Sequence, residues 1–138
     1  MNDPTYELTT VGWVQSPLVD RSAAPRQGDE GAPPARLVFR PEMRPALADL
    51  QPGQEVLVLT WLHQARRDVL AVHPRDDMTR PLTGLFATRS SERPNPIGLH
   101  RVVVTGVDGD IVAVDRLEAV DGTPVLDVKP VLGEVSER

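Results

Sequence analysis

Short runs of valine and leucine, broken by prolines and glycines, limit what this chain can fold into more than any other feature of its sequence. The 138 residues include 14 Pro and 10 Gly, and only five residues are aromatic. A core built mainly from Val and Leu favours strands, because branching at Cβ restricts rotamers in a helix and packs well on a pleated surface. The pattern therefore predicts an all-β fold, a small barrel or sandwich with six to eight short strands and one or two short helices.

The expected elements follow from hydrophobic periodicity and from the turn residues between the runs. Strands are expected over residues 6–16, 35–40, 54–64, 69–73, 84–88, 99–107, 111–117 and 124–128. The charged turn at 65–68 suits an antiparallel pair between the strands that flank it, and Asp108-Gly109 suits a hairpin turn. Apolar residues at helical spacing predict one short helix over 41–50, ended by Pro52-Gly53.

The length of the chain is that of one domain. Residues 1–138 are therefore expected to form a single unit without an additional C-terminal domain. Residues 19–34, rich in Asp, Gly, Ala and Pro, predict a long loop with the composition of a mobile segment, and residues 133–138 predict a frayed tail. The βαβ alternation and the Gly-rich turn of a dinucleotide-binding fold are missing, so any adenosine cofactor is expected to bind without that phosphate cradle.

Composition excludes several classes of protein and site. The chain has no cysteine, which excludes disulfides, thiolate metal sites and thiol nucleophiles. No apolar stretch approaches the roughly 20 residues that a membrane span needs. Residues 1–7 have neither the basic region nor the apolar core of a signal peptide, so a cytoplasmic protein without a membrane partner is expected.

The charge of the chain is acidic overall but uneven. A net charge of −5 argues against a general nucleic-acid binder, because phosphate contacts need a basic face. Between residues 75 and 101, however, five Arg stand against three acidic residues. Both a local basic surface and a few solvated arginines on a loop are consistent with this pattern.

The segment over residues 80–99 reads RPLTGLFATRSSERPNPIGL and is unusual for a loop with a purely structural role. Arg89 and Arg93 bracket a polar pair, and Asn95 stands between two prolines that restrict its backbone. Gly98 then allows a close backbone approach where the next strand begins. Such a loop is suited to present side chains in fixed directions, although a turn stiffened for stability would look the same from composition alone.

Residues 86–99 of this loop, FATRSSERPNPIGL, resemble the signature of the TsaA-like family of S-adenosylmethionine-dependent methyltransferases, F-A-T-R-S-P-x-R-P-N-P-I-G-L. Residues 121–130, DGTPVLDVKP, resemble the second signature of that family, D-G-T-P-[VI]-[LI]-D-[IV]-K-P-Y. Residues 11–17, followed by 25–28, resemble its opening pattern. Three separated blocks in the right order span nearly the whole chain.

The resemblance implies a single TsaA-like β-barrel, usually a homodimer, that uses S-adenosylmethionine and needs no metal. The best-understood members of the family methylate N6 of threonylcarbamoyladenosine at position 37 of certain tRNAs, which implies a tRNA anticodon loop as the partner. Carried over position by position, the resemblance implies the following cofactor-binding residues: Pro25, Arg26, Gln27, His63, Gln64, Arg89, Leu99, Asp121, Gly122, Thr123 and Pro124.

These assignments agree with the chemistry of the cofactor. A guanidinium such as that of Arg26 or Arg89 can hold its carboxylate bidentately, and backbone groups of the turn at 121–123 can read the edge of the adenine. Arg93 and Asn95 are candidate substrate contacts, with Arg93 suited to a carboxylate or phosphate. Deprotonation of the acceptor nitrogen calls for a base, and His63 is the one histidine nominated, since His73 and His100 lack an equally good context. A histidine at a strand end is more often structural, so the catalytic residue stays unassigned.

The sequence also departs from the family pattern. Ser91 replaces a proline, Glu92 adds a negative charge to the loop, and Val131 replaces an aromatic residue. Bacterial members that modify tRNA commonly carry a further C-terminal domain, which is not expected here. Three functions therefore remain: tRNA methylation, methylation of a small-molecule acceptor, and a non-catalytic module that serves in S-adenosylmethionine binding or in interaction with a partner.

Overall fold

The computed structural model describes residues 3–20, 24–26 and 30–133. The strands are β1 (Gly12–Gln15), β2 (Ala35–Phe39), β3 (Glu55–Trp61), β4 (Ala71–Val72), β5 (Thr83–Gly84), β6 (Ile97–Asp108), β7 (Ile111–Val114) and β8 (Pro124–Pro130). The helices are α1 (Arg44–Leu47) and the 3-10 turns η3 (Pro41–Met43), η4 (Pro74–Asp76) and η5 (Leu85–Ala87).

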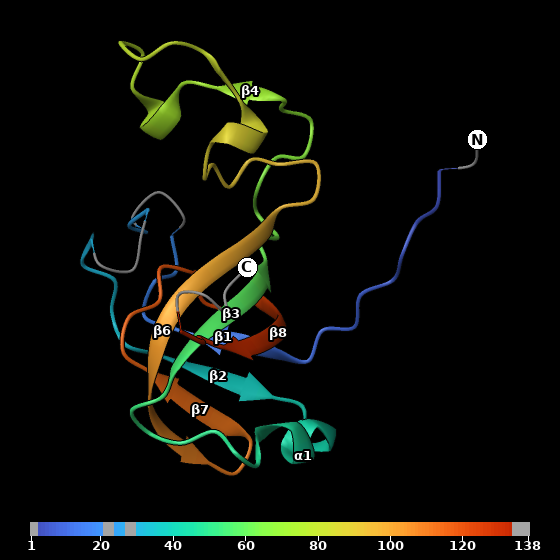
Figure 1. Ribbon diagram of the computed structural model, residues 1–138, viewed down its shortest axis with the longest axis vertical. Helices are drawn as coiled ribbons and strands as arrows, with labels where there is room; N and C mark the ends of the chain where they lie inside the picture. Colours follow the sequence, from blue (N-terminus) through green and yellow to red (C-terminus); the bar gives the residue numbers. More distant parts are fainter. Residues whose placement is uncertain (1–2, 21–23, 27–29, 134–138) are drawn as a thin grey trace.

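Six strands close into an antiparallel barrel in the order β1-β2-β7-β6-β3-β8, as shown in Figure 1. The remaining two strands, β4 and β5, pair only with each other in a segment that stands above the barrel (Figure 1). The prediction of an all-β barrel with little helix is therefore confirmed.

The core of the barrel consists of the side chains on one face of each strand. In β3 burial alternates strictly, so that Val56, Val58 and Thr60 point inward while their neighbours remain partly exposed. This is the period-2 pattern of a strand with one buried face. The core is built largely from valine, as the sequence predicts, with Leu37 and Leu117 as its largest fully buried members.

The predicted hairpin is present as β6 and β7. The two strands are joined by a two-residue turn that begins at Gly109, whose φ of 60° lies in the left-handed region that favours glycine. The predicted helix over 41–50 is present as η3 and α1, where Leu47 reaches the core. This short helical segment lies at the end of the barrel opposite to β4 (Figure 1).

Three expectations about strands are wrong. The strand expected over 6–16 is confined to β1, and Tyr6 and Leu8 before it are exposed. The strand expected over 69–73 does not pair with β3, because β6 and β8 already occupy both edges of β3; it is reduced to β4 and pairs with β5. The strand expected over 84–88 is a 3-10 turn, because the backbone N–H and hydroxyl of Thr88 both donate to the Leu85 carbonyl.

The described part of the chain contains no helix that is long and apolar enough to cross a membrane. The same residues contain no group of three or more His, Cys, Asp or Glu side chains that could hold a metal ion.

Candidate functional site

Three loops meet at one end of the barrel. Antiparallel pairing places the last residues of β1, β3 and β7 at the same end as the first residues of β2, β6 and β8. Residues 16–34, 62–96 and 115–123, which connect these strands, therefore all leave from this end, which we call the loop end. The Leu117 N–H donates to the Pro33 carbonyl at 3.1 Å and joins two of the three loops directly.

Residues 62–96, which we call the excursion, start and finish at neighbouring positions, because Trp61 pairs with Ile97. Its two arms remain together beyond the barrel. The Leu62 N–H donates to the Pro96 carbonyl at 2.8 Å, and the Arg93 N–H donates to the Arg66 carbonyl at 3.1 Å. These contacts hold the excursion upright on the barrel (Figure 1).

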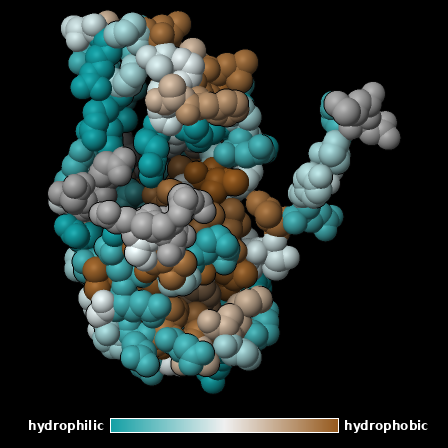
Figure 2. Space-filling model, in the orientation of Figure 1, coloured by the Kyte–Doolittle hydropathy of each residue, from teal (hydrophilic) through white to brown (hydrophobic). Residues whose placement is uncertain are grey.

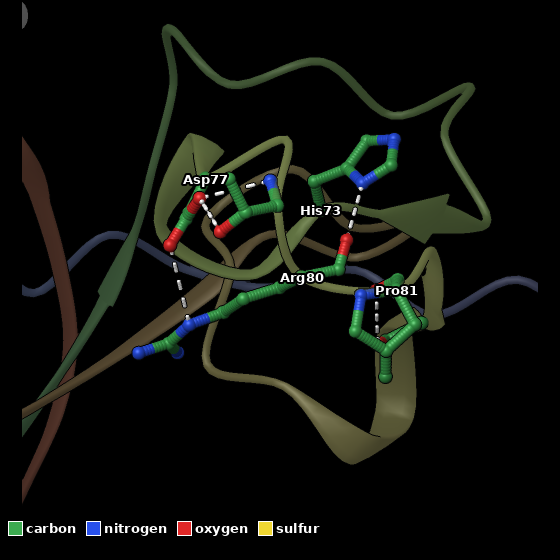
Figure 3. Close-up of polar contacts among 6 residues, drawn as sticks. His73, Asp77, Arg80 and Pro81 are labelled. Atoms are coloured by element: carbon green, nitrogen blue, oxygen red, sulfur yellow. Dashed lines mark hydrogen bonds and ion pairs between the residues drawn. The ribbon is translucent and has the colours of Figure 1, made fainter.

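The tip of the excursion is braced by a turn between β4 and β5. The Asp77 carboxylate accepts hydrogen bonds from the N–H and the hydroxyl of Thr79 at 2.9 and 2.5 Å, and it faces Arg80 at 3.6 Å. Those contacts, the Thr79 hydroxyl first, hold the pKa of the Asp77 carboxyl below its ordinary value. Figure 3 shows His73 closing the same turn, where its Nδ1 lies 2.9 Å from the Arg80 carbonyl and therefore carries the proton.

Arg93 organises the arginine- and proline-rich part of the excursion. Its guanidinium donates to the carbonyls of Thr88 and Ser90 at 3.0 Å each and to the carbonyl of Leu85 at 3.2 Å. Most of its directional donors are therefore used within the loop. Its predicted contact with a substrate stays a prediction, and the geometry gives Arg93 a clear role in shaping the loop.

Asn95, the second candidate substrate contact, lies on the surface where the excursion returns to the barrel. Its Oδ1 accepts from the Arg67 guanidinium at 3.3 Å, and the same guanidinium donates to the Pro94 carbonyl at 2.7 Å. Arg67 also stacks over the Trp61 ring, with its Cζ 5.1 Å from the ring centroid.

The predicted cofactor residues of the excursion and of β6 gather at the loop end. His63 and Gln64 are exposed directly after β3, and Leu99 is 44% exposed at the start of β6, paired with Leu59. Arg89 is exposed, and among the described residues its side chain has no hydrogen-bond or ion-pair partner. It differs in this respect from most arginines near it.

The long loop over 16–34 reaches across to the excursion. Arg26 forms an ion pair with Asp76, and Arg75 forms one with Glu30 at 2.6 Å. Arg75 and Asp76 both have positive φ, 56° and 57°, which is a strained conformation for residues with a side chain. Pro25 precedes this contact, whereas Gln27 lies outside the described residues.

The predicted turn at 121–124 packs against the start of the same long loop. The Asp121 carboxylate accepts a hydrogen bond from the Ser16 N–H at 2.9 Å, and the backbone N–H of Asp121 donates to the Leu18 carbonyl at 2.6 Å. Gly122 has a φ of 82°, which the turn requires. Thr123 is buried, with its hydroxyl on the Val120 carbonyl at 2.7 Å, and Pro124 begins β8 opposite Trp13.

A buried polar network beneath the loop end was not predicted from the sequence. His100 is 4% exposed; its Nδ1 lies 2.6 Å from the Glu118 carboxylate and its Nε2 lies 2.7 Å from the Thr60 hydroxyl. A neutral ring with its proton on Nδ1 satisfies both contacts. One feature of the sequence could have indicated this network: His100 occupies an inward-facing position of β6, and polar side chains at such positions are seldom without hydrogen-bond partners.

Two shallow hollows mark the surface. The larger, about 320 Å³, is also at the loop end, where Gln15, Pro34 and Val114 line it, and the second lies beside the turn between β6 and β7. Neither is lined by any of the predicted cofactor residues. Those residues share one end of the barrel but do not border either hollow in the single chain.

The fold and the site define a class of small proteins: closed antiparallel β-barrels whose candidate site is built from loops at one end. Here these loops are the excursion and residues 16–34 and 115–123. Residues 13–136 match the model of one such family, described as the tRNA-methyltransferase O N-terminal domain. The chain belongs to this family.

Curated relatives and solved structures agree with that placement. An Archaeoglobus fulgidus protein named "Probable S-adenosyl-L-methionine-binding protein" is 41% identical over 90% of this chain and 33% of its own length. A Methanothermobacter thermautotrophicus protein of the same name is 41% identical over 94% of this chain and 93% of its own length. Crystal structures of TrmO superpose with TM-scores of 0.78 and, for the Pseudomonas aeruginosa protein, 0.75, at 30% and 26% identity. Those superpositions include 100% and 98% of this chain but only 60% of either TrmO chain. The chain likewise spans about a third of the length of the Archaeoglobus protein.

Proposed function

We propose that this chain is an S-adenosylmethionine-dependent methyltransferase whose cofactor binds at the loop end and whose acceptor is N6 of threonylcarbamoyladenosine at position 37 of tRNA. One observation carries the proposal. The predicted cofactor residues come from three distant blocks of sequence, and the barrel topology brings the described ones to the same end. The names of the relatives, which are S-adenosylmethionine-binding proteins, and of the family, which is a tRNA methyltransferase domain, support it.

The residues at the loop end suit this cofactor. It has no phosphate, so a barrel without a Gly-rich helix start can bind it. Among the described residues the Arg89 guanidinium has no partner and can take the carboxylate, whereas Arg26 must share its guanidinium with Asp76 or release it. The backbone N–H groups of residues 121–123 already donate within the chain, so the carbonyls of the Asp121-Gly122 turn are the groups proposed to accept from the adenine amino group. Leu99 offers an apolar surface.

The cofactor would supply a methyl group on a sulfonium, which leaves by in-line displacement. The task of the protein is to hold donor and acceptor in line, and such positioning can contribute most of the rate enhancement. The rigid loop around Arg93 suits that task. The base that takes the acceptor proton stays unassigned; His63 is exposed at the loop end and is the histidine we nominate, whereas His100 is buried in its network.

We also propose that the chain acts as a homodimer in the cytoplasm. Five apolar side chains on the outer faces of β3 and β6 form one surface, which we call the outer stripe: Leu57, Leu59, Trp61, Ile97 and Leu99. Charged residues of both signs flank the outer stripe as two ion pairs, Arg101 with Glu55 and Lys129 with Asp127. An apolar centre with a rim of both charges is self-complementary, as a two-fold interface requires. Because Leu99 belongs to both the stripe and the predicted site, a second protomer would border the cofactor.

A small-molecule acceptor is the second candidate. Arg26, Arg66, Arg75 and Arg80 at the loop end are all paired with carboxylates of the chain. This pairing, together with the net charge of −5, leaves less free positive charge than a large phosphate footprint uses.

Methyl transfer from labelled S-adenosylmethionine tests the proposal and separates the candidates. The purified chain is incubated with tRNA from a strain that lacks the methylated nucleoside and, separately, with the small-molecule fraction of a cell extract. The proposal expects S-adenosylhomocysteine and the N6-methylated threonylcarbamoyl nucleoside by mass spectrometry of the tRNA digest. Turnover with the small molecules alone would establish the second candidate. Binding of the cofactor without turnover in either reaction would leave a non-catalytic module and refute the proposal.

A further inference from the structure

We propose that Phe86 is a stacking platform for a base of the RNA substrate, placed beside the site of methyl transfer. The inference rests on the proposed function, since it names one residue through which the loop end would hold its acceptor. It concerns a side chain to which neither the sequence patterns nor the comparisons assign a role.

Phe86 is unusually exposed for an aromatic residue. Its relative exposure is 86%, higher than that of any other large hydrophobic side chain that the structure describes. It lies in the middle of η5, between Leu85, which is 2% exposed and anchors the turn, and the loop that continues to Arg89. Figure 2 shows hydrophobic side chains on the excursion and on the part of the barrel beneath it.

The backbone under Phe86 is tightly held. The Leu85 carbonyl accepts from the Thr88 N–H, the Thr88 hydroxyl and the Arg93 guanidinium, at 2.9, 2.8 and 3.2 Å. The Ser90 N–H then donates to the Thr88 hydroxyl at 3.2 Å. The ring is therefore presented to solvent by a pre-organised turn, and a partner that stacks on it would pay little additional ordering entropy.

A cation stands beside the ring. The Cζ atom of Arg93 lies 6.0 Å from the Phe86 centroid, at the outer limit of a cation–π contact, and most of the ring surface remains uncovered. An aromatic face beside a guanidinium is the combination on which single-stranded nucleic acids stack their bases. Bases of an anticodon loop are unstacked and accessible, which makes them suitable occupants.

Position and charge favour an RNA base over a second protein. Phe86 is three residues from Arg89, the proposed cofactor contact, on the same braced loop, so a base stacked on Phe86 would lie next to the reacting one. The excursion carries six arginines, and three of them, Arg67, Arg89 and Arg93, have no carboxylate partner among the described residues, whereas the rest of the chain is strongly acidic. A polyanion is therefore more complementary to this part of the surface than another copy of this acidic chain.

The test uses a synthetic anticodon stem-loop RNA with 2-aminopurine next to the target adenosine, the full chain, and three variants. Phe86→Leu removes the aromatic face but keeps apolar volume, and Phe86→Trp keeps a face. Leu82→Ala is the matched control, because Leu82 is a 64% exposed apolar residue of the same excursion. Base–aromatic stacking is worth about 1–3 kcal/mol per base, so Phe86→Leu should weaken RNA binding about 5- to 150-fold and restore the quenched 2-aminopurine fluorescence. Phe86→Trp and Leu82→Ala should bind within about threefold of wild type.

Three other results would overturn the inference, and they are distinguishable. Wild-type chain that methylates RNA, with Phe86→Leu binding RNA equally well, would remove the platform and leave the proposed function intact. If the wild-type chain sediments as a dimer and Phe86→Leu sediments as a monomer, the ring belongs to the interface between two copies of the chain. Failure of the wild type to bind or methylate any RNA would remove both proposals. Phe86→Leu should bind S-adenosylmethionine in calorimetry with the affinity of the wild type, because the inferred contact is with the acceptor alone.

Discussion

The arginines at the loop end differ in whether their guanidinium groups already form an ion pair within the chain. Arg89 is exposed and, within the described residues, has no partner, whereas Arg26 is ion-paired with Asp76. A free guanidinium on a braced loop can bind an anionic group without first breaking an ion pair. This is why Arg89 is the better of the two arginines proposed for the cofactor carboxylate.

Replacement of Arg89 by alanine should therefore weaken binding of S-adenosylmethionine. The loss of a charged hydrogen bond is worth about 1.5–3 kcal/mol, or about 10- to 150-fold in the dissociation constant. Titration calorimetry measures it, with Arg44→Ala as the control that removes an arginine at the opposite end of the barrel. Equal affinity of wild type and Arg89→Ala would refute the assignment.

The buried network of Thr60, His100 and Glu118 makes a second residue-level prediction. Thr60→Val keeps the shape of the side chain but leaves His100 Nε2 without its partner in a buried place. A buried polar group left unsatisfied costs about 1–3 kcal/mol. Urea denaturation should show that loss in the free energy of unfolding. Thr105→Val, on the outside of β6, should change the same quantity by less than about 0.5 kcal/mol. Similar values for the two variants would show that the Thr60–His100 contact contributes nothing.

At the scale of elements, the start of β6 is packed directly against the end of β3. A Cβ atom at Gly98 would collide with the Thr60 hydroxyl and lie 2.7 Å from His100 Nε2. Gly98→Ala should therefore lower the melting temperature and destabilise the chain by about 1–3 kcal/mol, the usual cost of overpacking. Gly84→Ala is the control, because a Cβ there meets nothing within 4 Å. A Gly98→Ala variant as stable as Gly84→Ala would contradict this packing.

Elements whose signal is local were predictable from the sequence. The strand predicted over 54–64 (β3), the hairpin at Gly109 and the short helix before Pro52 are confirmed, because each depends on neighbouring residues alone. The pairing of β4 was not predictable from its own residues, since it depends on whether β3 has a free edge. The sequence predicts a strand instead of the turn at 85–87, because the hydrogen bond from the Thr88 hydroxyl to the Leu85 carbonyl leaves no periodic pattern in the sequence.

The candidate site was predictable only in part for the same reason. The three blocks of residues could be named from sequence, and the topology places the described ones at one end of the barrel. Contacts between distant parts of the chain could not be foreseen. Arg26 meets Asp76 across 50 positions, and His100 meets Thr60 across 40. The first pair depends on how loops fold over the barrel and the second on how β3 pairs with β6, and no short sequence pattern encodes either.

At the scale of the whole molecule, the outer stripe calls for a partner. Leu59 lies in its centre, opposite Leu99 on β6. Burying a charge at the centre of an apolar interface without a partner is strongly unfavourable, so Leu59→Glu should convert the proposed dimer into a monomer in analytical ultracentrifugation. Thr105→Glu, farther along the outer face of β6, should leave the dimer intact. A wild-type chain that sediments as a monomer at all concentrations would refute the dimer.

We propose above all that loops from three parts of the chain bind S-adenosylmethionine at one end of a β-barrel. A crystal structure of the chain grown with that cofactor tests it most directly. We expect density for the cofactor at the loop end, with its carboxylate on Arg89 and its adenine against the turn at Asp121. Cofactor bound in the hollow beside the β6–β7 turn, lined by Gly106 and Ile111, or on any other surface away from the three loops, would contradict it.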